Sequence, residues 1–293
     1  MPGLSDRGQP QPPIRHVTSR RIVAVRGDAL EVRDDRVVGE APLEIRAAGP
    51  RQDPVAVAVT MRTPGHEAEL AVGFLLSEGL LDGQDEVLGT AAGDPGKLSQ
   101  PDDTILVRLS KPFDDSKVAE RHFVATASCG ICGKASIDEV AQRTDPIPEG
   151  PVVRRAIILA MPGLLRAAQK AFDETGGLHA AGLFSAKGEL IAIREDVGRH
   201  NALDKLVGSQ VLMGARRLNG FILMVSGRVS FEIVQKAAVA GIPIVCAVSA
   251  PSDLAIDTAE RLGVTLVGFL RGDGFNVYSH DGRIDLRDLS GLG

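Results

Sequence analysis

The stretch that decides the fold runs from Gly220 to Phe269, where three short apolar runs alternate with two runs of helical character. The apolar runs are Gly220-Phe-Ile-Leu-Met-Val225, Pro243-Ile-Val-Cys-Ala-Val-Ser249 and Val264-Thr-Leu-Val-Gly-Phe269. Between them, Phe231–Gly241 and Ser252–Gly263 are expected to form helices, the second with Ser252 as its N-cap. Apolar strands separated by helices are typical of a parallel sheet with both faces covered. The stretch therefore predicts an α/β fold with a mostly parallel sheet.

The segments before this stretch predict further elements of both kinds. A helix is expected over Asn201–Met213, preceded by a β-hairpin that turns at Ala186-Lys187-Gly188. A further helix is expected over Ala156–Thr175, interrupted or restarted at Pro162-Gly163. The proline-containing run Thr144–Gly150 is the best candidate for an internal domain boundary.

The amino-terminal half predicts a smaller, β-rich domain. Short β-prone pieces between Arg20 and Ile45 are separated by expected turns at Arg26-Gly-Asp and Arg33-Asp-Asp. The other expected elements are strands over Pro54–Met61 and Thr104–Ser110, a helix capped by Thr63 and running to about Leu81, and a loop over Gly89–Asp103.

Composition excludes several classes of protein. A chain of 293 residues that is 44% hydrophobic can bury a full core, and a net charge of -5 favours neither nucleic acid nor an anionic membrane as a partner. With no Trp and one Tyr, it offers little for stacking bases. Three cysteines indicate a reducing compartment. No apolar run reaches the roughly 18 residues of a membrane span. We therefore expect a soluble cytoplasmic protein.

Two of the cysteines form the motif Ser128-Cys129-Gly-Ile-Cys132-Gly, which precedes Lys134 and a helix-compatible run over Ala135–Val140. A helix N-terminus and a nearby lysine both favour the thiolate over the thiol. The pattern indicates a reactive sulfur centre. A zinc half-site, a reducible redox pair and a structural disulfide remain open as alternatives. The third cysteine, Cys246, lies in an apolar strand and is expected to be an inert core residue.

Three polar segments follow the three apolar strands. They are Ser226-Gly227-Arg228, Ser249-Ala-Pro-Ser252-Asp253 and Arg271-Gly272-Asp273-Gly274. Ligands of open α/β sheets bind beyond the carboxyl ends of the strands, and backbone N–H groups at the following helix starts can hold phosphate. Each segment alone is equally compatible with a purely structural turn. Together, with two arginines, they predict a binding site for an anionic, nucleotide-like ligand.

His179 and His200 are two candidate functional imidazoles near these segments. Either could complete a zinc site with Cys129 and Cys132, because zinc takes four ligands or three plus water. However, zinc deaminases carry a proline directly before their Cys-x-x-Cys, and none precedes Cys129. This difference weakens the zinc hypothesis, and each histidine is equally compatible with a structural role.

The motifs of the chain resemble one family closely, the formate dehydrogenase accessory sulfurtransferases of the FdhD family, between about Pro42 and Ser279. The motifs that carry the resemblance are Thr63-Pro-Gly-His-Glu with Glu69-Leu-Ala-Val-Gly-Phe-Leu, Ser128-Cys-Gly-Ile-Cys-Gly, Gly177-Leu-His-Ala-Ala-Gly, Arg194-Glu-Asp-Val-Gly-Arg-His-Asn-Ala-Leu-Asp-Lys, Ser226-Gly-Arg-Val-Ser-Phe-Glu and Phe269-Leu-Arg-Gly-Asp-Gly. The resemblance implies a cytoplasmic, usually dimeric protein with a cytidine-deaminase-like α/β core. A shared fold does not carry the deaminase chemistry with it.

The resemblance also implies an activity. Members of the family accept sulfur as a persulfide from a cysteine desulfurase. They pass it to molybdenum in the bis(molybdopterin guanine dinucleotide) cofactor, before that cofactor enters formate dehydrogenase. By resemblance, Cys129 would carry the persulfide with Cys132 assisting. The family's cofactor-binding segment would be Phe269, Leu270, Arg271, Gly272, Asp273 and Gly274.

The complete expectation adds Ser226, Gly227, Arg228 and His200 to the cofactor-binding residues. The molybdenum cofactor is expected as a bound substrate, together with binding of a GDP-like nucleotide and no permanent metal. The domains are expected to be a disordered tail over 1–15, an α+β domain over 16–148 that carries the cysteine motif, and a cofactor-binding α/β domain over 149–293. One alternative function remains open: a non-catalytic carrier or chaperone of the cofactor, whose cysteines form a zinc or redox site.

Overall fold

The computed structural model describes residues 17–81, 83, 86–93, 103–119, 145–215 and 217–287. Several predictions fall outside these ranges: the tail over 1–15, the motif with Cys129 and Cys132, and the run Ala135–Val140. The domain boundary at 148/149 and the likeness to cytidine deaminases also stay predictions.

Within these ranges, the central sheet has six strands in the order β13-β12-β11-β10-β8-β9. Their bounds are β8 His179–Ser185, β9 Leu190–Asp196, β10 Phe221–Val225, β11 Ile244–Ala247, β12 Thr265–Arg271 and β13 Gly274–Ser279. Only β10, β11 and β12 pair in parallel, whereas β8, β9 and β13 join antiparallel. The prediction of a mostly parallel sheet is therefore wrong. The reason is that β8–β9 and β12–β13 are hairpins, whose short turns reverse the chain.

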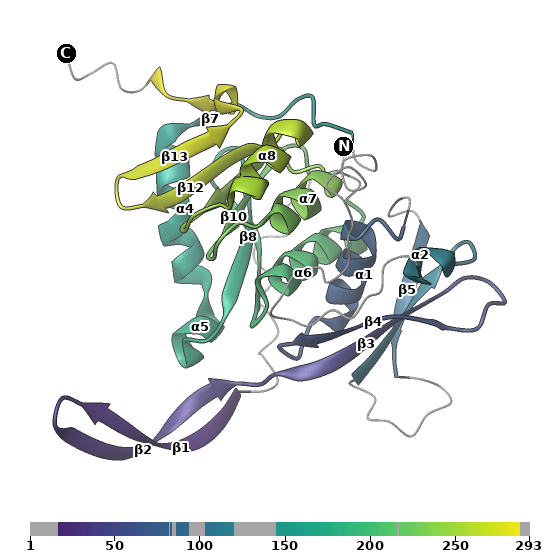
Figure 1. Ribbon diagram of the computed structural model, residues 1–293, viewed down its shortest axis with the longest axis horizontal. Helices are drawn as coiled ribbons and strands as arrows, with labels where there is room; N and C mark the ends of the chain where they lie inside the picture. The colour runs from purple at the N-terminus through teal and green to yellow at the C-terminus, as the bar shows by residue number, and fades with distance from the viewer. Residues whose placement is uncertain are drawn as a thin grey trace.

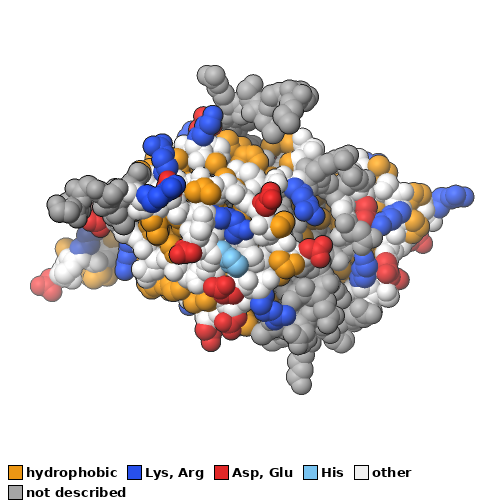
Figure 2. Space-filling view, turned by 90° about the horizontal axis from the view of Figure 1, so that it is seen from above, with side chains coloured by type: hydrophobic (Ala, Val, Ile, Leu, Met, Phe, Trp, Pro, Cys, Tyr) orange, Lys and Arg blue, Asp and Glu red, His pale blue; other side chains and the backbone are white. Residues whose placement is uncertain are grey.

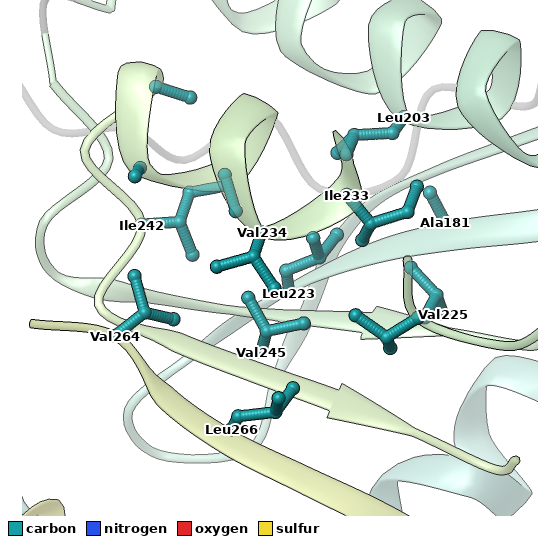
Figure 3. Close-up of a cluster of buried hydrophobic side chains, with 14 of the residues drawn as sticks. Ala181, Leu203, Leu223, Val225, Ile233, Val234, Ile242, Val245, Val264 and Leu266 are labelled. Atoms are coloured by element: carbon teal, nitrogen blue, oxygen red, sulfur yellow. The ribbon is translucent and has the colours of Figure 1, made fainter. Parts of the chain in front are cut away.

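Helices cover both faces of this sheet, as predicted. On one face lie α6 Arg199–Leu212, α7 Phe231–Val239 and α8 Asp253–Leu262. Figure 3 shows Leu223, Val245 and Leu266 of the sheet packed near α7. On the other face lies α4 Arg155–Ala168. Alternate residues of each central strand face different helices, which is why these strands are apolar throughout.

The expected break at Pro162-Gly163 is wrong, because α4 continues through Pro162 to Ala168, with Gln169 as its C-cap. A short helix, α5 Lys170–Thr175, follows. The carboxylate of Glu195 accepts hydrogen bonds from the N–H groups of Ala171 (3.2 Å) and Phe172 (3.1 Å). A side chain distant in sequence therefore sets the start of the new helix, which local sequence does not reveal.

A second sheet has, among the described residues, four strands in the order β4-β3-β6-β5. Its strands are β3 Ala41–Ala48, β4 Val55–Arg62, β5 Val87–Ala92 and β6 Thr104–Leu109, and a short helix, α2 Ser116–Ala119, follows β6. Because β5 extends to Ala92, the predicted loop from Gly89 is wrong over its first residues. Two short strands, β7 Val153–Arg154 and β14 Ile284–Asp285, pair separately, the second after the 3-10 turn Asp281–Arg283.

Helix α1, Glu67–Ser77, lies between the four-stranded sheet and α6 (Figure 1). It begins later than predicted because Gly65 (φ 103°) and His66 (φ 64°) adopt left-handed backbone conformations, so His66 and not Thr63 is its N-cap. Where α1 crosses α6, a Cβ added to Gly73 would overlap the Asp204 carbonyl oxygen, and one added to Gly208 would overlap that of Glu69. Glycine at these positions lets the two backbones touch.

The first hairpin, β1 Val17–Arg26 and β2 Ala29–Val38, projects from the body as an arm (Figure 1). The predicted turn at Arg26-Gly-Asp is confirmed. The predicted turn at Arg33-Asp-Asp is wrong, because these residues continue β2. Cross-strand ladder pairing outweighs the turn preference of two consecutive aspartates. The arm rests on the body at its base, where Arg36 Nη2 lies 2.8 Å from Glu174 Oε2.

Candidate functional site

The carboxyl ends of β10 and β11 bring two of the predicted polar segments together. The N–H of Val229 donates to the Ala250 carbonyl (3.2 Å), and the N–H of Ser252 donates to the Val229 carbonyl (2.9 Å). Ser252 also caps α8 as predicted, accepting from the N–H of Ala255 at 3.2 Å. The prediction that these segments meet at one sheet edge is confirmed.

The third segment lies further out, because β12 continues past its neighbours and turns at Gly272-Asp273. Phe269 has a left-handed backbone (φ 52°) and is 37% exposed, with the Arg271 guanidinium 5.7 Å from its ring centroid. A bulky residue with positive φ is strained, which marks this bulge as a specialised position. The side chain of Leu270, in contrast, is fully buried in the core.

Ser226 is held firmly at the end of β10. Its hydroxyl accepts from the N–H of Ala180 (2.9 Å), and its own N–H donates to the Ala180 carbonyl (3.0 Å). The hydroxyl therefore fixes the loop against β8. The next residue, Gly227, lies against the ring of His179, because a Cβ added there would be 3.1 Å from His179 Nδ1.

Two basic side chains lie at Gly227, His179 from the start of β8 and Arg199 from the start of α6, and Arg228 follows Gly227 in the loop after β10. The side-chain Cδ of Arg199 is 4.0 Å from a Cβ built on Gly227. Burial lowers the pKa of His179, and the positive charges of Arg199, His200 and Arg228 lower it further against the opposing effect of Asp196. The arrangement gathers positive charge at one point of the sheet edge.

His200, which the sequence singled out for ligand binding, is engaged inside the protein. Its Nε2 lies 2.8 Å from Glu232 Oε2 and 3.1 Å from Ser230 Oγ. Burial by itself raises the pKa of Glu232, but the hydrogen bond and charge of His200 lower it overall. His200 thus joins the starts of α6 and α7, and neither helix has a side-chain cap.

The remainder of the Arg194–Lys205 motif joins the two sheets through a buried network. Lys205 Nζ lies 2.7 Å from Asp196 Oδ2 and donates to the Thr63 carbonyl at 2.8 Å. Asp196 also accepts from the N–H of Thr63 (3.1 Å), and Asn201 donates to the Met61 carbonyl (2.7 Å). The Thr63 expected to cap a helix instead anchors the end of β4 to the carboxyl end of β9.

A second buried network includes Asp204, the residue of α6 directly before Lys205. Lys236 Nζ of α7 contacts both carboxylate oxygens of Asp204 (3.0 and 2.9 Å), Ser77 Oγ (2.8 Å) and Glu78 Oε1 (2.8 Å). Burial alone lowers the pKa of Lys236, but the carboxylates of Asp204 and Glu78 raise it above its ordinary value. Lys236 of α7 therefore links α1 and α6 through charged hydrogen bonds.

Glu69 at the start of α1 forms the third connection. Arg194 contacts it with two nitrogens, Nε to Oε2 at 2.5 Å and Nη2 to Oε1 at 2.7 Å, and His66 Nδ1 lies 2.9 Å from Oε2. Burial raises the pKa of Glu69, but Arg194 and His66 lower it to about 2. Glu69 therefore links the start of α1 to Arg194 of β9.

Cys246 lies fully buried in β11, as predicted, and burial raises the pKa of its thiol. Neither Cys129 nor Cys132 lies in the described part of the chain. Within that part, no cluster of three or more His, Cys, Asp or Glu side chains could hold a metal ion.

Sequence reasoning did not assign Arg199 to the site. It placed the helix start at Asn201, whereas α6 begins at Arg199. The signal that could have found Arg199 is the pair Arg199-His200 at a helix start, where the helix dipole disfavours cations unless an anion binds nearby.

The surface shows no uniform charge on the face displayed in Figure 2, where acidic, basic and hydrophobic side chains are interspersed. None of the helices in the described ranges is long and apolar enough to cross a membrane.

Comparison with known proteins places these features in a family context. A profile described as the FdhD/NarQ family matches residues 38–285. The sulfur carrier protein FdhD of Streptomyces avermitilis is 48% identical over 284 residues, covering 94% of this chain and 99% of that protein. The protein of the same name from Sulfurisphaera tokodaii is 42% identical and covers 90% of this chain and 97% of its own length.

One solved structure is similar over almost the whole chain. It is the crystal structure of a protein assigned as a formate dehydrogenase accessory protein from Desulfotalea psychrophila. The TM-score is 0.72 at 26% identity, with 92% of this chain and 99% of that chain covered.

Proposed function

The chain belongs to the FdhD/NarQ family, and we propose that it is a sulfur carrier that loads sulfur onto the molybdenum cofactor of a formate dehydrogenase. The observation that carries this proposal is the near full-length match to proteins named sulfur carrier protein FdhD. The matched range, 38–285, includes the motif with Cys129 and Cys132.

The proposed chemistry begins with transpersulfidation. The thiolate of Cys129 attacks the outer sulfur of a persulfide on a cysteine desulfurase. A new S–S bond forms at Cys129 while the donor's S–S bond breaks, and the donor cysteine leaves as a thiolate. A thiolate is the required nucleophile, and Lys134 together with the glycines around Cys129 suits that requirement.

Cys132 supplies the electrons for release. The carried sulfur is at the oxidation level of elemental sulfur, so its delivery as hydrosulfide needs two electrons. Attack of the Cys132 thiolate on Cys129 Sγ provides them. The Cys129–Cys132 disulfide forms and hydrosulfide leaves toward molybdenum. A cellular dithiol reductant then restores the two thiols.

The sulfur acceptor is the bis(molybdopterin guanine dinucleotide) form of the cofactor, bound as a substrate at the strand ends. Exposed Phe269 offers a ring for a base to stack on, and the turn Arg271-Gly272-Asp273-Gly274 flanks it. A GDP-like nucleotide binds at the same edge. The protein works in the cytoplasm as a homodimer, with a cysteine desulfurase as donor and formate dehydrogenase as client.

Mass spectrometry tests the central step. After incubation with a desulfurase and cysteine, the peptide that contains Cys129 should gain the mass of one sulfur atom. Cys129→Ala should lose both this gain and the activation of formate dehydrogenase. Cys246→Ala is the matched control and should keep both, because a buried thiol is inert.

The alternative, a non-catalytic carrier of the cofactor, makes the opposite predictions. Full activation of formate dehydrogenase by Cys129→Ala would support it and refute the persulfide. Stoichiometric zinc in the purified protein, lost in Cys132→Ala, would do the same.

A further inference from the structure

The arm formed by β1 and β2 exposes four aliphatic side chains on one of its two faces. In an antiparallel ladder, residues directly opposite one another share a face, and successive pairs alternate between the faces. Near the tip of the arm, the pairs Val23–Val32 and Val25–Leu30 therefore lie on the same face. Each of these four residues, which we call the arm patch, is between 57% and 73% exposed.

The opposite face of the arm is protected differently. Its apolar residues Ile22 and Ala24 are half-buried, and they lie opposite Arg33 and Glu31 of β2. Long charged side chains cover neighbouring apolar surface while their charged ends stay in water. The residues of the arm patch, in contrast, lie opposite one another across the ladder, so no charged side chain shields them in this way.

The arm patch lies away from the body of the protein. On the same face of the ladder, Arg36 at the base of the arm contacts Glu174 of α5 at 2.8 Å. Leu30 lies six residues from Arg36 along β2, which corresponds to about 20 Å. The tip therefore extends beyond α5, and Figure 1 shows the arm projecting from the body. An isolated two-stranded hairpin is only marginally stable in water, so a further surface is needed to cover the patch.

Helix α4 presents a second exposed apolar surface. The exposed face of a helix ordinarily carries charged or polar side chains. One face of α4 carries none, although its residues are exposed and follow helical spacing. We call this surface the α4 face, and its residues are Ala156, Ala160, Gly163, Leu164 and Ala167. Because four of the five residues are alanine or glycine, the surface is flat enough for a two-stranded ribbon to lie on it.

The areas involved favour a second copy of this chain as the partner. Each exposed aliphatic side chain presents about 100 Å², so the arm patch measures about 400 Å², a size typical of interaction sites. One arm on a foreign surface would bury about 800 Å² in total, which is the range of weak contacts. Two copies that exchange arms would form this contact twice and bury about 1,600 Å², the area of a standard stable interface.

We propose that the arm patch of each copy docks on the α4 face of a second copy, which gives a symmetric dimer with two equal contacts. The proposal deepens the homodimer of the proposed function and rests on the proposed function for that point alone. It goes further because it names both surfaces of the interface, and the sulfur chemistry does not enter it.

Analytical ultracentrifugation of the full chain tests the two surfaces. Wild type should sediment as a dimer. Val25→Glu in the arm patch and Ala160→Glu in the α4 face should each raise the dissociation constant at least about a hundredfold, because each dimer would bury two unpaired carboxylates. Val152→Glu, at an exposed valine outside both surfaces, is the matched control and should remain a dimer. Either surface variant that dimerises as tightly as wild type would overturn the proposal.

Mixing the two variants tests the exchange itself. A homodimer of either variant has no intact contact. A mixed dimer has one, in which the intact arm of the Ala160→Glu copy lies on the intact α4 face of the Val25→Glu copy. Native mass spectrometry should therefore detect mixed dimers that are weaker than wild type. A mixture without mixed dimers would overturn the exchange, and thermal unfolding of each variant checks that both are folded.

Sulfur loading of Cys129, measured on the same proteins, separates this proposal from the proposed function. If Val25→Glu stays dimeric while wild type gains sulfur, the docking fails and the sulfur carrier stands. If the variants dissociate and recombine as described but wild type never gains sulfur, the docking stands and the sulfur carrier fails. A monomeric wild type whose activation of formate dehydrogenase is lost in Val25→Glu would assign the arm to a different protein and overturn the proposal.

Discussion

The two sides of helix α6 contrast sharply in how they use charge. On the side facing α1 and β4, Asp204 and Lys205 are buried, and each has a partner of opposite charge at 2.7–3.0 Å. At its first turn, Arg199 stands beside His179 and Arg228 with no such partner in the described ranges. Arg199, Asp204 and Lys205 lie within six positions of one another in a single charged motif.

The difference teaches how to separate structural charge from functional charge. Buried ions need partners, and a protein that supplies them has used those ions for its own assembly. Cations left without partners at a strand edge are available for a ligand. The motif thus connects the two sheets and also carries Arg199 of the candidate site.

The largest effect should come from breaking the network around Lys236. Lys236→Met leaves Asp204 buried without its cation, so we expect a loss of about 3–5 kcal/mol in the free energy of unfolding. Lys170→Met, at an exposed lysine, is the matched control and should change little. Urea denaturation measures both. A variant as stable as wild type would show that this side of α6 does not depend on paired charge.

The next largest loss of stability should come from disturbing the close crossing of α1 and α6. Gly208→Ala places a Cβ against the Glu69 carbonyl, and we expect a loss of about 1–3 kcal/mol or more. Gly163→Ala in α4 has open space around its Cβ and should be neutral or stabilising, because alanine favours a helix over glycine. Equal thermal unfolding temperatures for the two variants would contradict the close crossing.

Low pH should weaken the ion pairs that Glu69 forms with Arg194 and His66. Its pKa is lowered from 4.5 to about 2, so its stabilisation is complete above about pH 5 and is lost as the pH falls toward 2. The shift corresponds to at most about 3 kcal/mol. Glu69→Gln should reduce the stability difference between pH 6 and pH 3 measured by urea denaturation. Exposed Glu149→Gln should leave the difference as in wild type.

The smallest effect should come from His200, which belongs to the paired side despite its position beside Arg199. His200→Gln should cost about 0.5–1.5 kcal/mol, the contribution of a partly buried hydrogen bond. Binding of inorganic pyrophosphate, a probe for the anionic ligand expected at this sheet edge, should weaken less than in Arg199→Met. If His200→Gln lost more pyrophosphate affinity than Arg199→Met, His200 would belong to the ligand site and its assignment to the paired side of α6 would be wrong.

Sequence reasoning could find what is encoded locally. The strands β10, β11 and β12, their helices and the meeting of two polar segments at one edge all follow from apolar periodicity and turn chemistry. It missed features set by distant contacts. The antiparallel additions to the sheet, the helix break at Gln169 imposed by Glu195, and the left-handed Gly65-His66 before α1 all depend on tertiary structure.

The same limit applies to the site. The charged motif could be recognised in the sequence, but the division of its members could not. Only the structure shows that His200 is engaged by Glu232, while Arg199 Nε is buried without a hydrogen-bond partner among the described residues. The cysteine motif was found by sequence alone, and its geometry lies outside the described residues.

The central claim is that α6 carries structural charges at Lys205 and a ligand-binding charge at Arg199. The most direct test measures two quantities, the free energy of unfolding and the pyrophosphate affinity, in both Lys205→Met and Arg199→Met. Lys205→Met should lose about 3–5 kcal/mol of stability, because Asp196 loses its buried cation. Arg199→Met should keep its stability and lose about tenfold to a hundredfold in affinity. If instead Arg199→Met unfolds readily while its affinity is unchanged, Arg199 is a structural residue and the contrast is wrong.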